Sequence, residues 1–282
     1  MHLKFTPFFL GFIFHAFISF GQLSPDPLTY LVEGSKVKGY FFSSGQANAP
    51  TLFFTHGFTD SGNKWKIGTA LSSSGINVFI IDFRGCYESE GKYSLFNAQK
   101  DIHEGLVYLK SSRVRNKYQI DTVNIILGGY SFGGGMVLTY ALHHPNVEKV
   151  FTIAGLDVGR FSDELTQDYY LANMYAAIFD TVKKPFGPID FKYEEPLMEL
   201  FNDAEYFKVM DAEVKMQASK ILLIAGREDK TVDYYQHSIP LYKHLKKSDS
   251  AVNLNVYSSG HSFEKVSNQV LTDIISWIKQ IE

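Results

Sequence analysis

The sequence contains only one cysteine, Cys86, so the chain cannot form a disulfide within itself. Small secreted modules that lack a large core usually depend on several disulfides, and such a module is therefore excluded. The chain has 282 residues, 45% of them hydrophobic, which is enough apolar material for a sizeable core. The single cysteine also lies far from the N-terminus, which argues against a lipid-anchored cysteine there.

The sequence also lacks an excess of charge of one sign. It has 27 Lys and Arg residues against 30 Asp and Glu residues, for a net charge of −3. This balance offers no electrostatic basis for binding nucleic acid or an anionic membrane surface. Metal-ligand spacing and phosphate-binding glycine loops are missing as well, so we expect no cofactor and no metal. The expected partner is a small molecule.

The N-terminal apolar run is too short to cross a membrane comfortably, since a spanning helix needs about 20 apolar residues. Residues 8–20 are mostly apolar, follow Lys4 and are closed by the small residues Ser19 and Gly21. This pattern predicts a secretory signal peptide over residues 1–21. The alternative is an uncleaved N-terminal anchor. We expect an exported protein, periplasmic or secreted, whose mature chain has no stable membrane insertion.

Apolar runs alternate with segments of helical periodicity along residues 22–282, which we expect to form one domain. This alternation is typical of an α/β fold, with a mainly parallel sheet and helices on both faces. About eight strands are expected, at residues 28–32, 37–42, 51–55, 77–83, 123–127, 149–154, 220–225 and 252–257. Helices are expected at residues 63–74, 94–112, from the turn at 131 to about 144, 234–247 and 266–279.

About sixty residues, approximately 156–217, separate the sixth and seventh predicted strands, which is more than one crossover needs. The segment is rich in Tyr and Phe and is divided by Pro185, Pro188 and Pro196. We interpret it as a short helical lid insertion, because ligands of open α/β sheets bind at the carboxyl ends of the strands. The alternative is an aromatic satellite core that makes no contact with substrate.

Residues 129–133 read Gly-Tyr-Ser-Phe-Gly and join a predicted strand to a predicted helix. In that setting a G-x-S-x-G pattern indicates a nucleophile elbow, a sharp turn between strand and helix. The glycines leave room for a strained turn that lifts a serine hydroxyl above the edge of the sheet. Ser131 is therefore the candidate nucleophile.

A serine hydroxyl needs a base to take its proton, and the base needs a third group to orient it. The loop after the seventh predicted strand supplies Asp229, although Glu228 and Asp233 are close enough to compete. The loop after the last predicted strand supplies His261. Along the chain, Ser131, Asp229 and His261 thus follow the order nucleophile, acid, base.

From about residue 28 to 282 the sequence resembles an α/β-hydrolase of the serine-nucleophile type. Its three motifs occur in the order and context of that family. The resemblance implies that Ser131 is the nucleophile and that His261 is the general base and acid. Asp229 would fix the tautomer of the imidazole and stabilise the imidazolium.

The resemblance also implies an oxyanion hole, which needs hydrogen-bond donors held in place before the reaction. The family takes one donor from the residue after the nucleophile, here the N–H of Phe132. It takes the other from a loop after an early strand, where residues 56–58 (His-Gly-Phe) resemble its His-Gly-X motif. We assign that donor to the N–H of Phe58, and we expect His56 to be a structural or pocket-wall residue rather than a base.

Two features depart from the family pattern. Residues 82–89 resemble its Asp-x-Arg-Gly-x-Gly-x-Ser stretch, but Cys86 or Tyr87 replaces the second glycine, so the loop is expected to differ in shape. The elbow also continues with three glycines, residues 133–135, and glycine in a helix interior costs about 1 kcal/mol relative to alanine. Close packing of this helix against the sheet or the lid would offset that cost.

Serine at the elbow argues against dehalogenase or epoxide hydrolase chemistry, which uses a carboxylate nucleophile, and leaves acyl transfer to water. The motifs resemble those of feruloyl or cinnamoyl esterases and of prolyl oligopeptidase-like enzymes. We expect hydrolysis of carboxylic esters with small or medium acyl groups through an acyl-enzyme. The alternatives are a serine exopeptidase or amidase, with Glu194 or Glu195 anchoring a substrate amine, and a non-catalytic binding module. The sequence does not indicate the oligomeric state.

Overall fold

The structure is a computed structural model that describes residues 24–58, 60, 64–185, 187–191, 194–210, 212, 216, 218, 220–247 and 251–280. The predicted signal peptide, residues 1–21, lies outside the described residues. So do the side chains of Glu194 and Glu195, the predicted anchors for a substrate amine. Within the described ranges, no helix combines the length and the apolar character that crossing a membrane requires.

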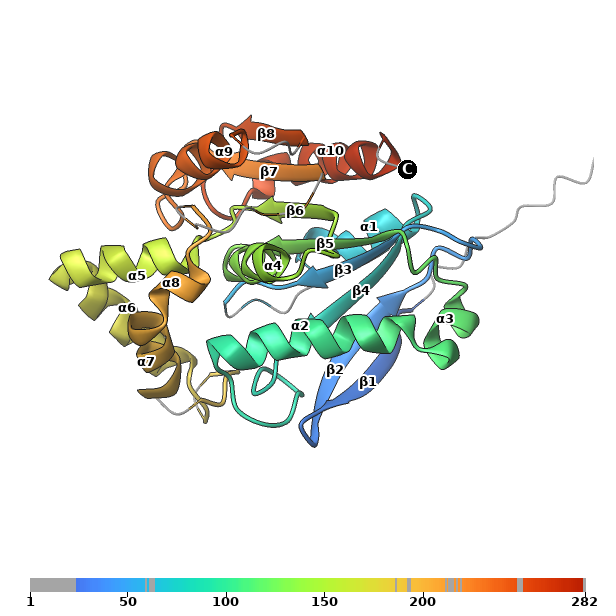
Figure 1. Ribbon diagram of the computed structural model, residues 1–282, viewed down its shortest axis with the longest axis horizontal. Helices are drawn as coiled ribbons and strands as arrows, with labels where there is room; N and C mark the ends of the chain where they lie inside the picture. The colour runs from blue at the N-terminus through green and yellow to red at the C-terminus, as the bar shows by residue number, and fades with distance from the viewer. Residues whose placement is uncertain are drawn as a thin grey trace, which may run out of the picture.

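An eight-stranded sheet runs through the middle of the molecule in the order β1-β2-β4-β3-β5-β6-β7-β8 (Figure 1). β2 pairs antiparallel with β1 and β4, and all the other pairs are parallel. The predicted sheet, mainly parallel and of about eight strands, is confirmed. The strands are β1 (Asp26–Val32), β2 (Ser35–Phe42), β3 (Thr51–Thr55), β4 (Asn77–Asp82), β5 (Ile125–Tyr130), β6 (Lys149–Ile153), β7 (Lys220–Gly226) and β8 (Ala251–Tyr257).

Helices cover both faces of the sheet, as predicted, so β3 and β4 are buried along their whole length. Neighbouring side chains of β3 enter two different cores. Phe53 packs into the core on the side of α2, α4 and α9, and Phe54 packs into the core on the side of α1 and α10. The helices on these faces are α1 (Ile67–Ser72), α2 (Leu95–Lys110), α3 (Ser112–Tyr118), α4 (Phe132–His143), α9 (Ile239–Leu245) and α10 (Ser267–Gln280). Three short helical turns accompany them: η1 (Lys64–Lys66), η2 (Tyr234–Ser238) and η3 (Glu264–Val266).

The elements around the elbow differ from the prediction in two places. β5 continues to Tyr130 instead of ending at Leu127, because Gly128 and Gly129 pair with β3 and β6 on either side. Glycine is a poor strand former, so its inclusion depends on these neighbours and not on local preference. The short helix α3 was not predicted, and it follows α2 after a break at Ser111, whose backbone is extended.

The glycines at the start of α4 allow this helix to lie directly against backbone, which is the expected close packing. A Cβ on Gly133 would come within 2.3 Å of the His56 carbonyl oxygen. A Cβ on Gly135 would come within 2.0 Å of the Leu156 carbonyl oxygen. Real Cβ atoms do not approach an oxygen so closely, so the contact of α4 with the loops after β3 and β6 requires glycine at both positions.

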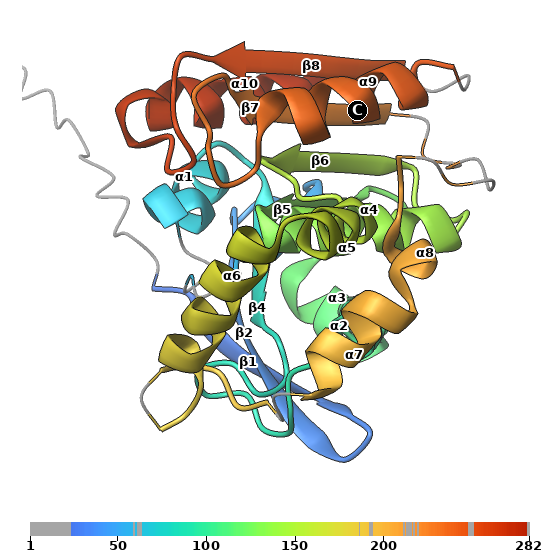
Figure 2. The same cartoon turned by 90° about the vertical axis from the view of Figure 1, so that its left-hand side faces the viewer.

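The segment predicted as a helical insertion contains α5 (Val158–Gln167), α6 (Tyr169–Val182), α7 (Glu194–Asn202) and α8 (Ala204–Phe207). These helices lie together at one end of the molecule, which faces the viewer in Figure 2. The buried Asp157 carboxylate joins the two ends of the segment. It accepts hydrogen bonds from the Arg160 N–H at the start of α5 and from the Val209 and Met210 N–H groups beyond α8. One side chain therefore links the beginning and the end of the insertion.

Candidate active site

Ser131 occupies a sharp turn between β5 and α4. Its backbone has φ 53° and ψ −121°, a region that residues with a Cβ rarely adopt. Hydrogen bonds hold this conformation: the Ser131 N–H donates to the Ile153 carbonyl at 2.8 Å, and the Ser131 carbonyl accepts from Gly135 and Leu156 at 3.1 Å. Strain at a single residue that its surroundings hold in place is common at functional sites.

The structure brings Ser131, His261 and Asp229 into one chain of contacts. His261 Nε2 lies 2.9 Å from Ser131 Oγ, and His261 Nδ1 lies 2.7 Å from Asp229 Oδ2. A carboxylate can only accept, so Nδ1 carries the proton that is donated to Asp229, and Nε2 accepts from the serine hydroxyl. The Asp229 side chain is 1% exposed and that of His261 is 22% exposed, so solvent reaches the imidazole but not its carboxylate partner.

Asp229 is distinguished from its two competitors by its contacts. Its Oδ1 accepts from the Thr231 and Val232 N–H groups at 2.8 and 2.9 Å, which leaves Oδ2 for the imidazole. Asp233 instead caps η2 by accepting from two backbone N–H groups there, and Glu228 is exposed. Asp229 is therefore the carboxylate of these three that contacts the imidazole.

Two aromatic residues contact the loop that carries His261, and neither was predicted from the sequence. The ring of Tyr130 lies 5.1 Å from the ring of His261, and its hydroxyl donates to the His261 carbonyl at 2.9 Å. Trp65 Nε1 donates to the Ser262 carbonyl at 3.0 Å. Tyr130 is the variable residue before the serine in the elbow motif, so the pattern itself carries no signal for this role.

The backbone N–H groups of Phe58 and Phe132, the predicted oxyanion donors, lie on two adjoining segments of the fold, after β3 and at the start of α4. Phe132 is the first residue of α4, and the first N–H groups of a helix have no partner within the helix. Phe58 follows β3, which pairs directly with β5. Its ring lies 6.1 Å from the ring of Phe132. Within the described part of the chain, neither amide has a hydrogen-bond acceptor.

His56 is a buried neighbour of this site and is not the base. Its Nδ1 lies 2.7 Å from the Gly57 carbonyl oxygen, so Nδ1 carries the proton and donates it. Its Nε2 lies 3.9 Å from Asp82 Oδ1 at the end of β4. Burial lowers the pKa of His56, so the ring is neutral at neutral pH. Burial, with a smaller contribution from the Glu88 carboxylate, raises the pKa of Asp82 to about 7.

The raised pKa of Asp82 predicts a pH-dependent loss of stability that Asp82→Asn removes. The native state keeps a proton that the unfolded chain releases near its ordinary pKa of 3.8, so wild-type stability falls as pH rises from about 4 to about 7. Over that range the free energy of unfolding of the variant is expected to rise relative to that of the wild type by up to roughly 4 kcal/mol, since one pKa unit corresponds to about 1.36 kcal/mol. Urea unfolding of both proteins at several pH values measures this difference. A difference in free energy of unfolding that stays constant across this pH range would contradict the raised pKa of Asp82.

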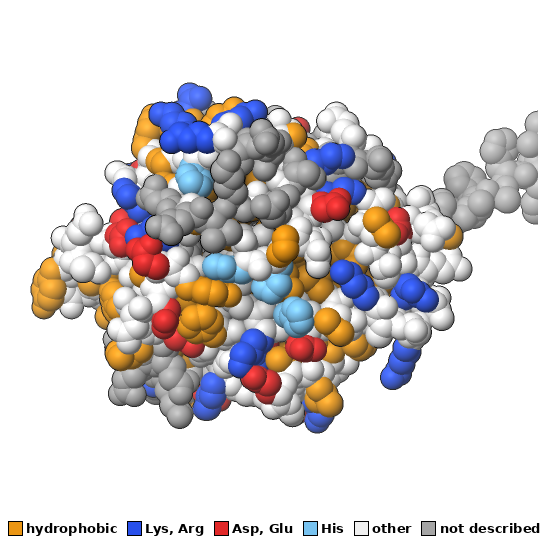
Figure 3. Space-filling view, in the orientation of Figure 1, with side chains coloured by type: hydrophobic (Ala, Val, Ile, Leu, Met, Phe, Trp, Pro, Cys, Tyr) orange, Lys and Arg blue, Asp and Glu red, His pale blue; other side chains and the backbone are white. Residues whose placement is uncertain are grey.

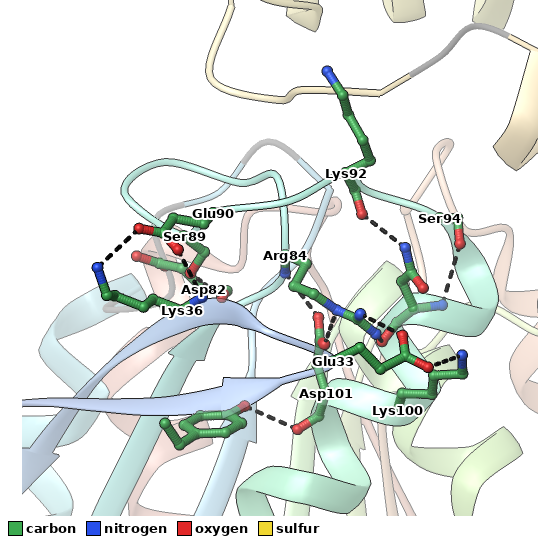
Figure 4. Close-up of polar contacts among 12 residues, drawn as sticks. Glu33, Lys36, Asp82, Arg84, Ser89, Glu90, Lys92, Ser94, Lys100 and Asp101 are labelled. Atoms are coloured by element: carbon green, nitrogen blue, oxygen red, sulfur yellow. Dashed lines mark hydrogen bonds and ion pairs between the residues drawn. The ribbon is translucent and has the colours of Figure 1, made fainter.

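The loop after β4 differs from the family pattern at Tyr87. Tyr87 has φ 50°, a left-handed conformation that glycine adopts more readily, so Tyr87 stands where the family pattern has its second glycine. The loop is held at its base by Arg84, whose backbone N–H and Nε donate to the buried Asp101 carboxylate at 2.7 and 2.5 Å (Figure 4). At its far side, the Ser89 hydroxyl donates to the Asp82 carbonyl at 2.6 Å.

The fold and the site define an α/β-hydrolase, and comparison with known proteins agrees. A family model described as "alpha/beta hydrolase fold" matches residues 50–194, just over half of the chain. The chain therefore belongs to the α/β-hydrolase fold family.

Individual relatives and solved structures are more distant. A protein named "Putative proline iminopeptidase" from Mycoplasma pneumoniae is 26% identical over 141 residues, 50% of this chain and 43% of that protein. The chain thus spans less than half the length of the curated relatives it matches. An esterase from Pyrococcus furiosus has a TM-score of 0.65 and 19% identity, with 91% of each chain covered. An α/β-hydrolase from Penicillium sp., GrgF, has a TM-score of 0.68 and 16% identity, covering 92% of this chain and 99% of that one. These solved structures share the fold of the chain.

Proposed function

We propose that the protein is a serine hydrolase that cleaves carboxylic esters of small or medium acyl groups through an acyl-enzyme. One observation carries the proposal, namely the position of the His261 ring between Ser131 Oγ and Asp229 Oδ2. A proton-accepting nitrogen beside a serine hydroxyl, oriented by a buried carboxylate, is the arrangement that activates serine as a nucleophile.

The reaction proceeds in two halves. Ser131 Oγ attacks the ester carbonyl carbon while His261 Nε2 takes the hydroxyl proton, and Asp229 stabilises the imidazolium that forms. The Phe58 and Phe132 N–H groups bind the oxyanion of the tetrahedral intermediate. His261 then gives its proton to the leaving alcohol as the carbon–oxygen bond breaks. In the second half, water attacks the acyl carbon while it loses a proton to His261. The bond from that carbon to Ser131 Oγ then breaks, His261 returns the proton to Oγ, and the acid is released.

The alternative function is a serine exopeptidase or amidase that uses the same three residues. Similarity to the Mycoplasma pneumoniae protein, whose name is that of a peptidase, favours it, whereas similarity to the Pyrococcus furiosus esterase favours ester cleavage. A third alternative is a non-catalytic binding module. The distance of 2.9 Å between Ser131 Oγ and His261 Nε2 argues against it, because a binding module has no need of such a contact. We further propose that residues 1–21 direct export to the periplasm or the medium, and that the 156–217 segment acts as a lid.

Two measurements on the purified protein test this function. We expect p-nitrophenyl acetate and butyrate to be hydrolysed faster than aminoacyl p-nitroanilides, because p-nitrophenolate leaves as a stable anion, whereas the nitrogen of p-nitroaniline must be protonated as its bond to carbon breaks. We also expect a fluorophosphonate probe to label Ser131, which peptide mass spectrometry locates. Faster turnover of the anilides would favour the exopeptidase, and failure of the probe to label Ser131 would favour the binding module.

A further inference from the structure

An aromatic cluster connects the proposed oxyanion hole to helix α6 of the insertion. The ring of Phe179, on α6, lies 5.0 Å from the ring of Phe58. The ring of Phe191, which is 2% exposed, lies 5.7 Å from Phe179 on an edge-to-face approach of 77°. Phe58 also contacts the rings of Tyr93 and Phe132. Phe179 is therefore held between a ring beside the oxyanion donor and a fully buried ring.

Helix α6 leaves part of its inner face accessible. It is strongly apolar, yet none of its side chains with described burial is fully buried. Leu171, Tyr175 and Phe179 pack on the main core but stay partly exposed. Other side chains of the helix point to solvent: Tyr170 is 81% exposed, and Ile178 beside Phe179 is 37% exposed. Figure 3 shows hydrophobic side chains at the surface at this end of the molecule. The half-buried rings of Phe58 and Phe179 thus retain apolar surface, and Phe58 follows Gly57, where a Cβ would lie 3.3 Å from Ser131 Cβ.

The chemistry of acyl transfer places the acyl group on this side of Ser131. The leaving alcohol takes its proton from His261 Nε2, so it lies on the side of His261. The carbonyl oxygen lies at the two backbone N–H groups. In the sheet, β3, which leads to Phe58, and β8, which leads to His261, stand on opposite sides of β5. The acyl chain is the remaining substituent of the tetrahedral carbon, and the side away from His261 is the side of Phe58, on which the Phe179 ring packs.

We propose that Phe179, packed against Phe58, forms the end wall of the acyl pocket and limits the length of the acyl group. The inference rests on the proposed ester hydrolysis and adds its substrate class, namely esters of short-chain acids. Because Phe191 supports the ring from behind, a longer chain cannot displace Phe179 without moving a buried side chain.

The test compares acyl-chain preference in variants at two neighbouring positions of α6. Phe179→Ala is expected to raise the ratio of kcat/KM for p-nitrophenyl decanoate to that for the butyrate by about tenfold or more, the scale of discrimination that a few methylenes produce in an apolar pocket. Phe179→Trp is expected to lower the same ratio. Ile178→Ala, at a more exposed position of the same helix, is the matched control and should leave the ratio as in the wild type.

Each other outcome has a distinct meaning. An unchanged ratio in Phe179→Ala, or an equal loss for all esters, would overturn the acyl-pocket assignment while leaving Ser131-dependent hydrolysis intact. A changed ratio in Ile178→Ala as large as that in Phe179→Ala would also overturn it, because the effect would then belong to the helix as a whole. Absence of ester hydrolysis by the wild type would instead contradict the proposed function itself.

Discussion

Ser131→Ala is expected to lower kcat for p-nitrophenyl butyrate by on the order of 10⁴-fold or more, as loss of a serine nucleophile does in other serine hydrolases. The substitution removes only Oγ, the atom that lies 2.9 Å from His261 Nε2. Without it, no covalent acyl-enzyme forms and the imidazole has no hydroxyl to deprotonate. Steady-state kinetics and the loss of fluorophosphonate labelling both measure the effect.

The fold should survive this change. The left-handed backbone at Ser131 strains alanine as much as serine, and the hydrogen bonds that hold the turn are made by backbone atoms. The matched control is Ser262→Ala, because the Ser262 side chain is exposed and only its carbonyl contacts Trp65. Retention of more than about a tenth of wild-type kcat in Ser131→Ala, with a wild-type thermal midpoint, would show that another group is the nucleophile.

The residues of the site were predictable because each one follows a strand. The carboxyl ends of parallel strands meet at one edge of a sheet, so loops that are distant along the chain come together there. Asp229 follows β7 and His261 follows β8; β7 was visible as an apolar run and β8 as an alternation of apolar residues with asparagine. The sequence patterns of these strands, together with the positions where the strands end, were therefore enough to predict that the loops carrying the site residues lie together.

The supporting contacts were not predictable in the same way, because they join residues with no pattern relating them. Asp157 accepts hydrogen bonds from residues 209 and 210, more than fifty positions away, and only the folded insertion brings them together. The burial that raises the pKa of Asp82 likewise depends on the packing around β4 and not on its sequence neighbours. The aromatic segment was recognised by composition, but which of its rings reaches Phe58 depends on the tertiary position of α6.

A second large effect is expected from Asp229→Asn, which should lower kcat by about 10⁴-fold while the protein stays folded. The asparagine oxygen can still accept from the Thr231 and Val232 N–H groups, as Asp229 Oδ1 does. The side-chain amide then faces His261 Nδ1 and donates to it. The imidazole must adopt the tautomer with its proton on Nε2, so the nitrogen beside Ser131 can no longer accept the hydroxyl proton.

Two control variants separate this effect from the loss of a nearby charge. Asp233→Asn keeps a good helix cap at the start of η2, since Asn caps about as well as Asp, and it should retain wild-type kcat. Glu228→Gln changes an exposed side chain and should do the same. A fall in kcat shared equally by the three variants would mean that the electrostatic field of the loop matters and not the orientation of His261. A fall confined to Asp229→Asn, with an unchanged thermal midpoint, identifies the single carboxylate that selects the tautomer of the base.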